Sequence, residues 1–187
     1  EEVDEKEYLT DAFTREAVSF IDRHQKEPFL LLLTYNAVHN PQHAKPEHLE
    51  RFKSIEDETR RNYAGMLTAL DDGVGQVIGK LDSAGLSKNT LVAFFSDNGG
   101  PPVNGSTNGT LRGQKATTWE GGVRVPFVLR WPGRFESGKE FQEPVIQLDL
   151  LPTTLAAAGV PLPESEPIDG VNLLPYLSGE KTGAPHS

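Results

Sequence analysis

The 187-residue chain is predicted to form an α/β fold in which helices flank a mostly parallel central sheet. Stretches with apolar residues at helical spacing alternate along the chain with short runs that are almost wholly apolar. Such a run is typical of a strand buried on both faces of a sheet. The first two runs lead directly into polar residues, at positions 36–40 and 96–98. Because ligand sites in open α/β sheets gather at the carboxyl ends of strands, these polar residues mark the expected site.

The first half of the chain contains three of the expected helical regions and one strand. Apolar residues at helical spacing predict an amphipathic helix over residues 8–24, and the apolar run 29–35 predicts the first strand. Residues 46–59 are charged and predict a surface segment with short helical pieces. A stronger helical pattern covers residues 60–84, and Gly85 is a suitable residue to end that helix.

The second half is expected to add two strands and one helix. Residues 91–95 and 126–131 predict strands, and residues 149–158 predict a helix. The stretch 159–187 is rich in Pro and Gly and predicts no regular element. The sequence contains no internal repeat and no low-complexity linker, so it predicts no domain boundary.

Composition excludes several classes of function. The net charge of −9 argues against a nucleic-acid partner, which needs a basic surface. No apolar run approaches 18 residues, so no membrane span is expected. The absence of cysteine excludes disulfides, zinc–thiolate sites and a thiol nucleophile within these residues. Because the protein is acidic overall, an anionic substrate would need a local positive pocket.

Four residues are candidates for a site that binds a metal and an anion. Asp97 and Asn98 carry side-chain oxygens that suit a hard cation such as calcium or magnesium. Lys115 is a lone cation in a polar loop, and His39 can transfer protons near neutral pH. Each also has an ordinary explanation: Asp-Asn-Gly is a common turn sequence, and most loop lysines and histidines are simply solvated. Only their combination favours a site.

Two tripeptides in the loop that follows the second strand match the N-glycosylation pattern. They are Asn104-Gly-Ser and Asn108-Gly-Thr. A loop rich in Gly, Asn, Ser and Thr produces such matches easily, so we interpret both as chance.

Five motifs, in order, resemble the sulfatase family, the formylglycine-dependent branch of the alkaline-phosphatase-like superfamily. They are Tyr-Asn-Ala-Val-His-Asn-Pro at 35–41, Phe-Ser-Asp-Asn-Gly-Gly at 95–100, Leu-Arg-Gly-Gln-Lys at 111–115 continuing to Glu-Gly-Gly-Val-Arg-Val-Pro at 120–126, Asp-Leu-Leu-Pro-Thr at 149–153, and Asp-Gly-Val-Asn-Leu at 169–173. The pattern is most similar to sulfatases that act on sulfated carbohydrates. It implies an alkaline-phosphatase/sulfatase-like α/β fold in incomplete form.

The resemblance implies a role for each candidate. Asp97 and Asn98 would be ligands of a Ca²⁺ ion, with Mg²⁺ possible, that polarises the sulfate oxygens. Lys115 would bind a sulfate oxygen and offset charge as the S–O bond breaks, and His39 would contact the sulfate and protonate the departing alcohol. Asp149 and Asp169 in the last two motifs are interpreted as structural, a helix cap and a turn.

One departure from the family pattern limits what the chain is expected to do. The family nucleophile is a formylglycine made from Cys or Ser in the motif C/S-x-P/A-x-R, and the sequence contains no such motif and no N-terminal aspartate pair. Residues 1–187 are therefore expected to be a partial catalytic domain that lacks the N-terminal nucleophile half and the C-terminal subdomain. Alone it is expected to be inactive, and to fold poorly because strand edges would stay unpaired.

Two other functions stay open. One is a phosphatase, phosphodiesterase or phosphonate hydrolase of the same superfamily, and the other is a sulfatase-like protein that binds glycans without cleaving them. For a sulfatase, the expected partner is a sulfated carbohydrate or an aryl sulfate. Family habit implies export to the periplasm, the cell exterior or the lysosome.

Overall fold

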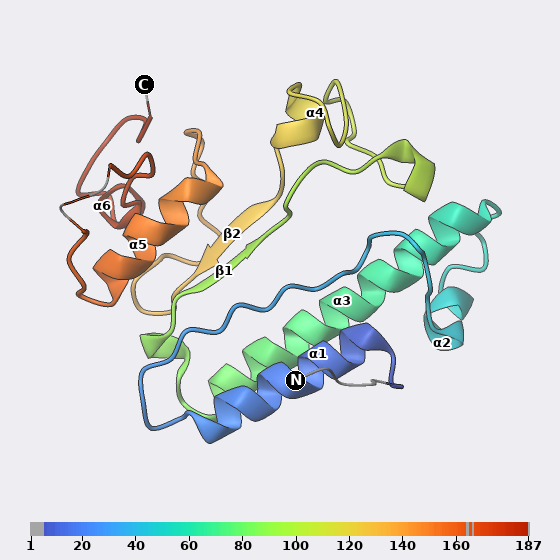
Figure 1. Cartoon of the computed structure of the whole chain (residues 1–187), viewed down its shortest axis with the longest axis horizontal. Coiled ribbons are helices and arrows are strands. Elements are labelled where there is room, and N and C mark those ends of the chain that lie inside the picture. The colour runs from blue at the N-terminus through green and yellow to red at the C-terminus, as the bar shows by residue number, and fades with distance from the viewer. Residues whose placement is uncertain (1–5, 164, 166, 187) are drawn as a thin grey trace. The chain divides into compact units, whose positions relative to one another are not determined.

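The computed structural model describes residues 6–163, 165 and 167–186. Within these residues the chain forms two compact units. Unit 1 holds the described residues up to Leu86 together with Phe94–Val128, and unit 2 holds Ser87–Ala93 and the described residues from Leu129 onward. The elements are drawn in Figure 1. None of the helices in the described part of the chain combines the length and apolarity that a membrane span requires.

Unit 1 is built on two long helices, α1 (Leu9–Arg23) and α3 (Glu58–Ser83), which lie side by side with the short helix α2 (Pro46–Glu50) against α3 (Figure 1). Their shared core consists of small and medium apolar side chains: Ala12, Ala17, Ile21, Met66, Ala69 and Leu81. The helices predicted over residues 8–24 and 60–84 are thus confirmed to within two residues at each end.

Both ends of α3 follow from local sequence. The Asp57 side chain caps the helix by accepting the Arg60 N–H at 2.6 Å. At the other end Gly85 adopts φ 72°, which glycine reaches without steric cost, and the Leu86 N–H donates to the Leu81 carbonyl at 2.9 Å. Gly85 therefore ends the helix as the sequence predicted.

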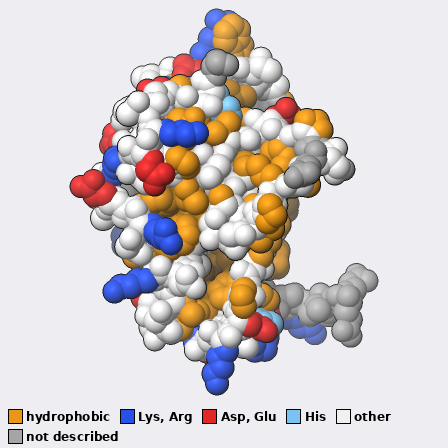
Figure 2. Space-filling model, turned by 90° about the vertical axis from the view of Figure 1, so that its left-hand side faces the viewer, with side chains coloured by type: hydrophobic (Ala, Val, Ile, Leu, Met, Phe, Trp, Pro, Cys, Tyr) orange, Lys and Arg blue, Asp and Glu red, His pale blue; other side chains and the backbone are white. Residues whose placement is uncertain are grey.

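The predicted first strand, residues 29–35, is extended but forms no strand in the described structure. One side of it packs on α1, where the Phe29 ring meets Phe20 edge-on at 5.8 Å. The other side is open, with Leu30 83% and Leu32 80% exposed. Hydrophobic side chains also reach the surface in the view of Figure 2. The prediction of burial on both faces is wrong here, because no described element covers the second face.

Tyr35 fixes the far end of this segment to both long helices. Thr14 donates its hydroxyl hydrogen to the Thr10 carbonyl at 2.8 Å, so Tyr35 must be the donor in the 2.7 Å contact between the Tyr35 and Thr14 hydroxyls. Gly73 of α3 allows this approach, since a Cβ there would lie 2.5 Å from Thr14 Oγ1. Burial raises the pKa of Tyr35, which keeps this donor protonated.

The predicted second and third strands are confirmed as β1 (Val92–Phe95) and β2 (Phe127–Arg130), which pair in a two-stranded sheet. Beyond the strands, backbone hydrogen bonds join Ser96 to Pro126 and Gly99 to Gly122, so the two segments run in opposite directions. The parallel arrangement expected for most of the central sheet is therefore not found in this pair. The helices and the small sheet agree with the predicted α/β class.

Unit 2 contains the predicted helix as α5 (Leu150–Ala157) and an unpredicted short helix, α6 (Leu174–Leu177). Asp149 stands at the N-cap position of α5, but its side chain makes no capping bond to that helix. Instead the carboxylate, which is fully buried, accepts the N–H groups of Ile146 and Val171, each at 2.8 Å. Short 3₁₀ turns complete the described fold: Ser87–Asn89, Pro102–Asn104 and Gln147–Asp149.

Asp149 and Thr153, which we call the buried anchor, hold the last motif of the chain in place. Asp149 bonds the Val171 N–H, and Thr153 Oγ1 accepts the Leu173 N–H at 2.9 Å. His186 Nε2 lies 2.9 Å from both Asp149 carboxylate oxygens. The motifs at 149–153 and 169–173 are thus two halves of one structural feature, in which Asp169 itself is exposed.

Candidate functional site

Two of the four candidate residues, 76 positions apart in sequence, meet in unit 1. Lys115 Nζ lies 3.2 Å from His39 Nε2. His39 Nδ1 lies 2.7 Å from the Asn40 carbonyl oxygen, which can only accept, so Nδ1 carries a hydrogen. Nε2 of a neutral His39 then accepts from the Lys115 ammonium. The peptide bonds Ala37–Val38 and Asn40–Pro41 on either side of His39 are cis.

Lys115 projects from a tight turn. The Thr117 N–H donates to the Gln114 carbonyl at 3.0 Å, and the Thr117 hydroxyl bonds both the N–H and the carbonyl of Gln114. Ala116 takes φ 68°, in the left-handed region that disfavours a side chain. The half-buried Lys115 is therefore held at the corner of a closed and locally strained turn.

Asp97 and Asn98 lie just past the end of β1, as predicted, with Asp97 exposed and Asn98 half-buried. The next residue, Gly99, is buried, and its N–H donates to the Gly122 carbonyl at 2.9 Å. A methyl group at Gly99 would overlap the Gly121 carbonyl oxygen. Glycine is required here by the close approach of α4 (Glu120–Val123), a helix of one turn.

Asn108, which the sequence did not single out for the site, joins the two loops that carry the candidates. Its side-chain oxygen accepts the Gly100 N–H at 2.9 Å, and its side-chain nitrogen donates to the carbonyls of Gly100 at 2.9 Å and Gly113 at 3.1 Å. We call this set of three bonds the Asn108 clasp. The only sequence signal at Asn108 was the glycosylation pattern, which says nothing of these contacts.

The oxygen donors fit part of a calcium site. Asp97 and Asn98 supply a carboxylate and an amide oxygen on adjacent residues, and both are the hard ligands that calcium prefers. Calcium takes about six to eight oxygens. Across the described residues no group of three or more His, Asp or Glu side chains is arranged to hold a metal. The pair can therefore be only part of a ligand set.

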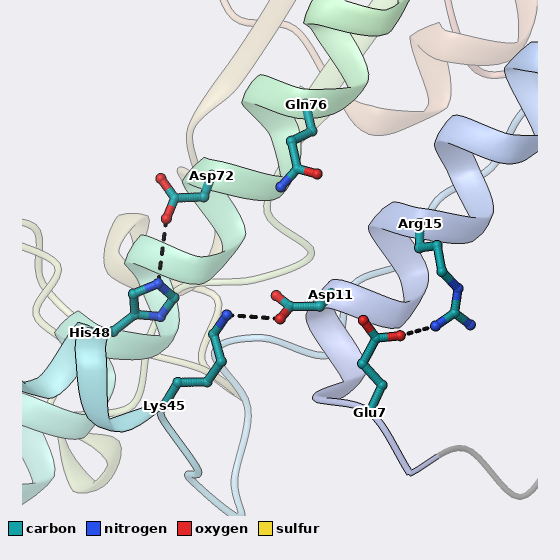
Figure 3. A pocket seen from close by; sticks show the side chains of 7 residues that line it. All are labelled: Glu7, Asp11, Arg15, Lys45, His48, Asp72 and Gln76. Carbon is teal, nitrogen blue, oxygen red and sulfur yellow. Dashed lines mark hydrogen bonds and ion pairs between the residues drawn. The ribbon is translucent and has the colours of Figure 1, made fainter.

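A separate cavity of about 290 Å³ lies between α1, α2 and α3 (Figure 3). Its polar side chains contact each other: Lys45 with Asp11 at 2.8 Å, Arg15 with Glu7, and His48 Nε2 with Asp72 at 3.4 Å. The hydrogen bond to Asp11 raises the pKa of Lys45, which stabilises the ammonium form of Lys45. None of the four candidate residues lines this cavity, so it is distinct from the candidate site.

Comparison with known proteins identifies the family. The Sulfatase family model matches residues 1–160. The chain belongs to the sulfatase family. It is 37% identical to human steryl-sulfatase in an alignment of 187 positions that covers 95% of this chain and 31% of that protein. A more distant structure, the phosphonate monoester hydrolase SpPMH from Silicibacter pomeroyi, matches 66% of the chain and 23% of its own, at a TM-score of 0.54 and 30% identity.

The sulfatase fold is also present in solved structures. The crystal structure of Ps i-CgsB superposes with a TM-score of 0.95 at 43% identity, over 100% of this chain and 42% of that one. The same protein has been solved in complex with k-i-k-neocarrahexaose. The expected alkaline-phosphatase-like α/β class is thus confirmed. The chain spans about a third of the length of its curated relatives, 29–34% of the first four.

Proposed function

We propose that residues 1–187 form the second part of the catalytic domain of a sulfuric ester hydrolase that acts on sulfated carbohydrates or aryl sulfates. The observation that carries the proposal is the 3.2 Å contact between His39 and Lys115, which joins two family motifs in a chain of sulfatase fold. The oligosaccharide bound by Ps i-CgsB favours a carbohydrate substrate over a small aryl sulfate.

In the proposed reaction, water replaces the alcohol on sulfur: the bond between sulfur and the bridging oxygen breaks, and the alcohol leaves with a proton. Lys115 donates to a sulfate oxygen and offsets the negative charge that develops as this bond breaks. His39 needs a proton on Nε2 to protonate the alcohol, because Nδ1 already donates to Asn40. A protonated His39 and the Lys115 ammonium repel each other, so an anion that contacts both stabilises the pair.

Asp97 and Asn98 are the proposed ligands of Ca²⁺, or alternatively Mg²⁺. A bound cation of this kind polarises the sulfate oxygens and stabilises charge in the transition state. Two adjacent oxygen donors do not complete its shell, so the remaining ligands are expected from outside these residues. The formylglycine nucleophile is likewise expected outside them, since the sequence contains no Cys and no matching Ser motif.

Phosphoryl or phosphonate transfer is the second candidate function, because sulfate and phosphate esters share tetrahedral geometry. The likeness to SpPMH covers 66% of the chain, whereas the likeness to human steryl-sulfatase covers 95% of it. That contrast favours sulfate esters. The non-catalytic glycan binder is disfavoured because His39 and Lys115 keep a mutual contact suited to an anion.

The decisive experiment expresses these residues within their complete reading frame and compares Lys115→Ala and His39→Ala with wild type. We expect each variant to lower kcat/KM for sulfate-ester cleavage by roughly 10²–10³-fold, as for loss of a group that stabilises transition-state charge. Lys139→Ala, at an exposed lysine of unit 2, is the matched control and should keep wild-type activity. A wild-type protein that cleaves phosphate esters and leaves sulfate esters intact would overturn the proposal.

Two further parts of the proposal have their own tests. The 187 residues alone are expected to release no sulfate, and measurable release by that polypeptide would contradict this. The complete protein is expected to be exported, as cell fractionation would show; recovery of the mature protein only from the cytoplasm would contradict that expectation.

A further inference from the structure

We propose that Asn108 is a positioning residue that sets the spacing between the loop of Asp97 and Asn98 and the turn of Lys115. The inference rests on the proposed function for the roles of those three residues. It extends that function by assigning a task to a side chain whose three clasp bonds all go to backbone groups.

The clasp bonds backbone groups that lie two residues from a candidate side chain in each loop. Gly100 follows Asn98 by two residues, and Gly113 precedes Lys115 by two. Asn108 bonds both polar groups of Gly100 and the carbonyl of Gly113 with a single planar amide. A displacement of either loop therefore breaks at least one of these bonds.

A second connection fixes the same loops through backbone hydrogen bonds. The Gly99 N–H donates to the Gly122 carbonyl, and the Gly121 N–H donates to the Arg112 carbonyl at 2.7 Å. These backbone bonds link both loops to α4. The spacing between the two loops is therefore held both by α4, through backbone bonds, and by Asn108, through its side chain.

The chemistry of the clasp selects asparagine. One acceptor and two donors are needed in one plane, and a primary amide supplies all of them. Aspartate keeps the acceptor for the Gly100 N–H but places carboxylate charge against the carbonyl oxygens of Gly100 and Gly113. The Asn108 nitrogen already donates to two carbonyls, so attaching a glycan to it would break the clasp.

The test compares Asn108→Asp and Asn108→Ala with wild type in the complete enzyme. Activity per folded molecule is expected to fall about 10–100-fold in kcat, because a small misplacement of groups that act on one substrate has that effect, while KM stays within about threefold. Hydrogen exchange at residues 97–100 and 112–115 is expected to speed up about tenfold. Asn89→Asp makes the same chemical change at an exposed position and should alter neither quantity.

Several outcomes would overturn the inference. Unchanged exchange in both loops would do so, as would a kcat within about twofold of wild type in both variants. Loss of the folded state in both variants would also overturn it, since Asn108 would then support the whole unit. A glycan on Asn108 of the active protein would exclude the clasp. If wild-type enzyme does not cleave sulfate esters, the proposed function fails, and the exchange measurement still tests the clasp.

Discussion

The Asn108 clasp of unit 1 and the buried anchor of unit 2 use the same device with different results. In each, a polar side chain forms hydrogen bonds with backbone groups of another segment of the chain. Asp149 and Thr153 are fully buried, and the segment they hold carries no candidate for chemistry. The clasp holds loops whose candidate side chains, Asp97, Asn98 and Lys115, are exposed or half-buried. Family motifs in this chain are therefore of two kinds, those that contain the candidate residues and those that hold the backbone.

The largest expected effect is a loss of stability when the buried anchor of unit 2 is removed. Asp149→Ala removes the acceptor of two buried N–H groups and the partner of His186, so we expect a loss of about 3–5 kcal/mol in the free energy of unfolding. Urea unfolding measures it. Asp169→Ala, at an exposed residue of the adjoining motif, is the control and should stay within about 0.5 kcal/mol of wild type. Equal effects of the two variants would refute the structural role of the anchor.

A smaller effect on stability but a larger one on activity is expected in unit 1. Gly99→Ala places a methyl group against the Gly121 carbonyl, which displaces the loop of Asp97 and Asn98. Activity of the complete enzyme should fall about 10²-fold, as misplaced catalytic groups predict. A Cβ added at Gly79 of α3 meets no atom within 4 Å. Gly79→Ala should therefore raise the free energy of unfolding by up to about 1 kcal/mol and keep full activity. Wild-type activity in Gly99→Ala would show that the close approach does not matter.

The smallest expected effect concerns the turn of Lys115. Ala116 has a left-handed backbone conformation, which costs a residue with a side chain about 1–2 kcal/mol, so Ala116→Gly removes this cost. Part of the gain in stability is lost because glycine has more conformational freedom in the unfolded chain. A net stabilisation below about 1 kcal/mol should be seen in thermal unfolding. Ala158→Gly, at φ −83°, should be destabilised instead. If both variants change the thermal stability in the same direction, that result would argue against strain at Ala116.

The sequence predicted most of the fold because its patterns are local. Helical periodicity located α1 and α3, and the apolar runs located β1 and β2. The prediction of a strand buried on both faces failed at residues 29–35, because an apolar run indicates a preference for burial and not the presence of a layer that covers it. The sequence also assigned Asp149 to a cap, since the pairing of two motifs 20 residues apart has no local signal.

The site divides in the same way. His39, Asp97, Asn98 and Lys115 could be named because their side-chain types and the family motifs suggest chemistry, and the structure adds that His39 and Lys115 touch. Their catalytic and metal-binding roles stay predictions. Asn108 could not be found, because a side chain that bonds only backbone carbonyls and N–H groups looks like any other loop asparagine.

The open face of residues 29–35 has a practical consequence for anyone who handles this polypeptide. Leu30 and Leu32 present neighbouring apolar side chains to water on an extended backbone that no strand pairs in the described structure. An unpaired, apolar extended edge is a template for another chain. A concentrated sample of the 187 residues should therefore associate through this segment first, and its light scattering should rise with concentration well before the helices α1 and α3 lose any structure.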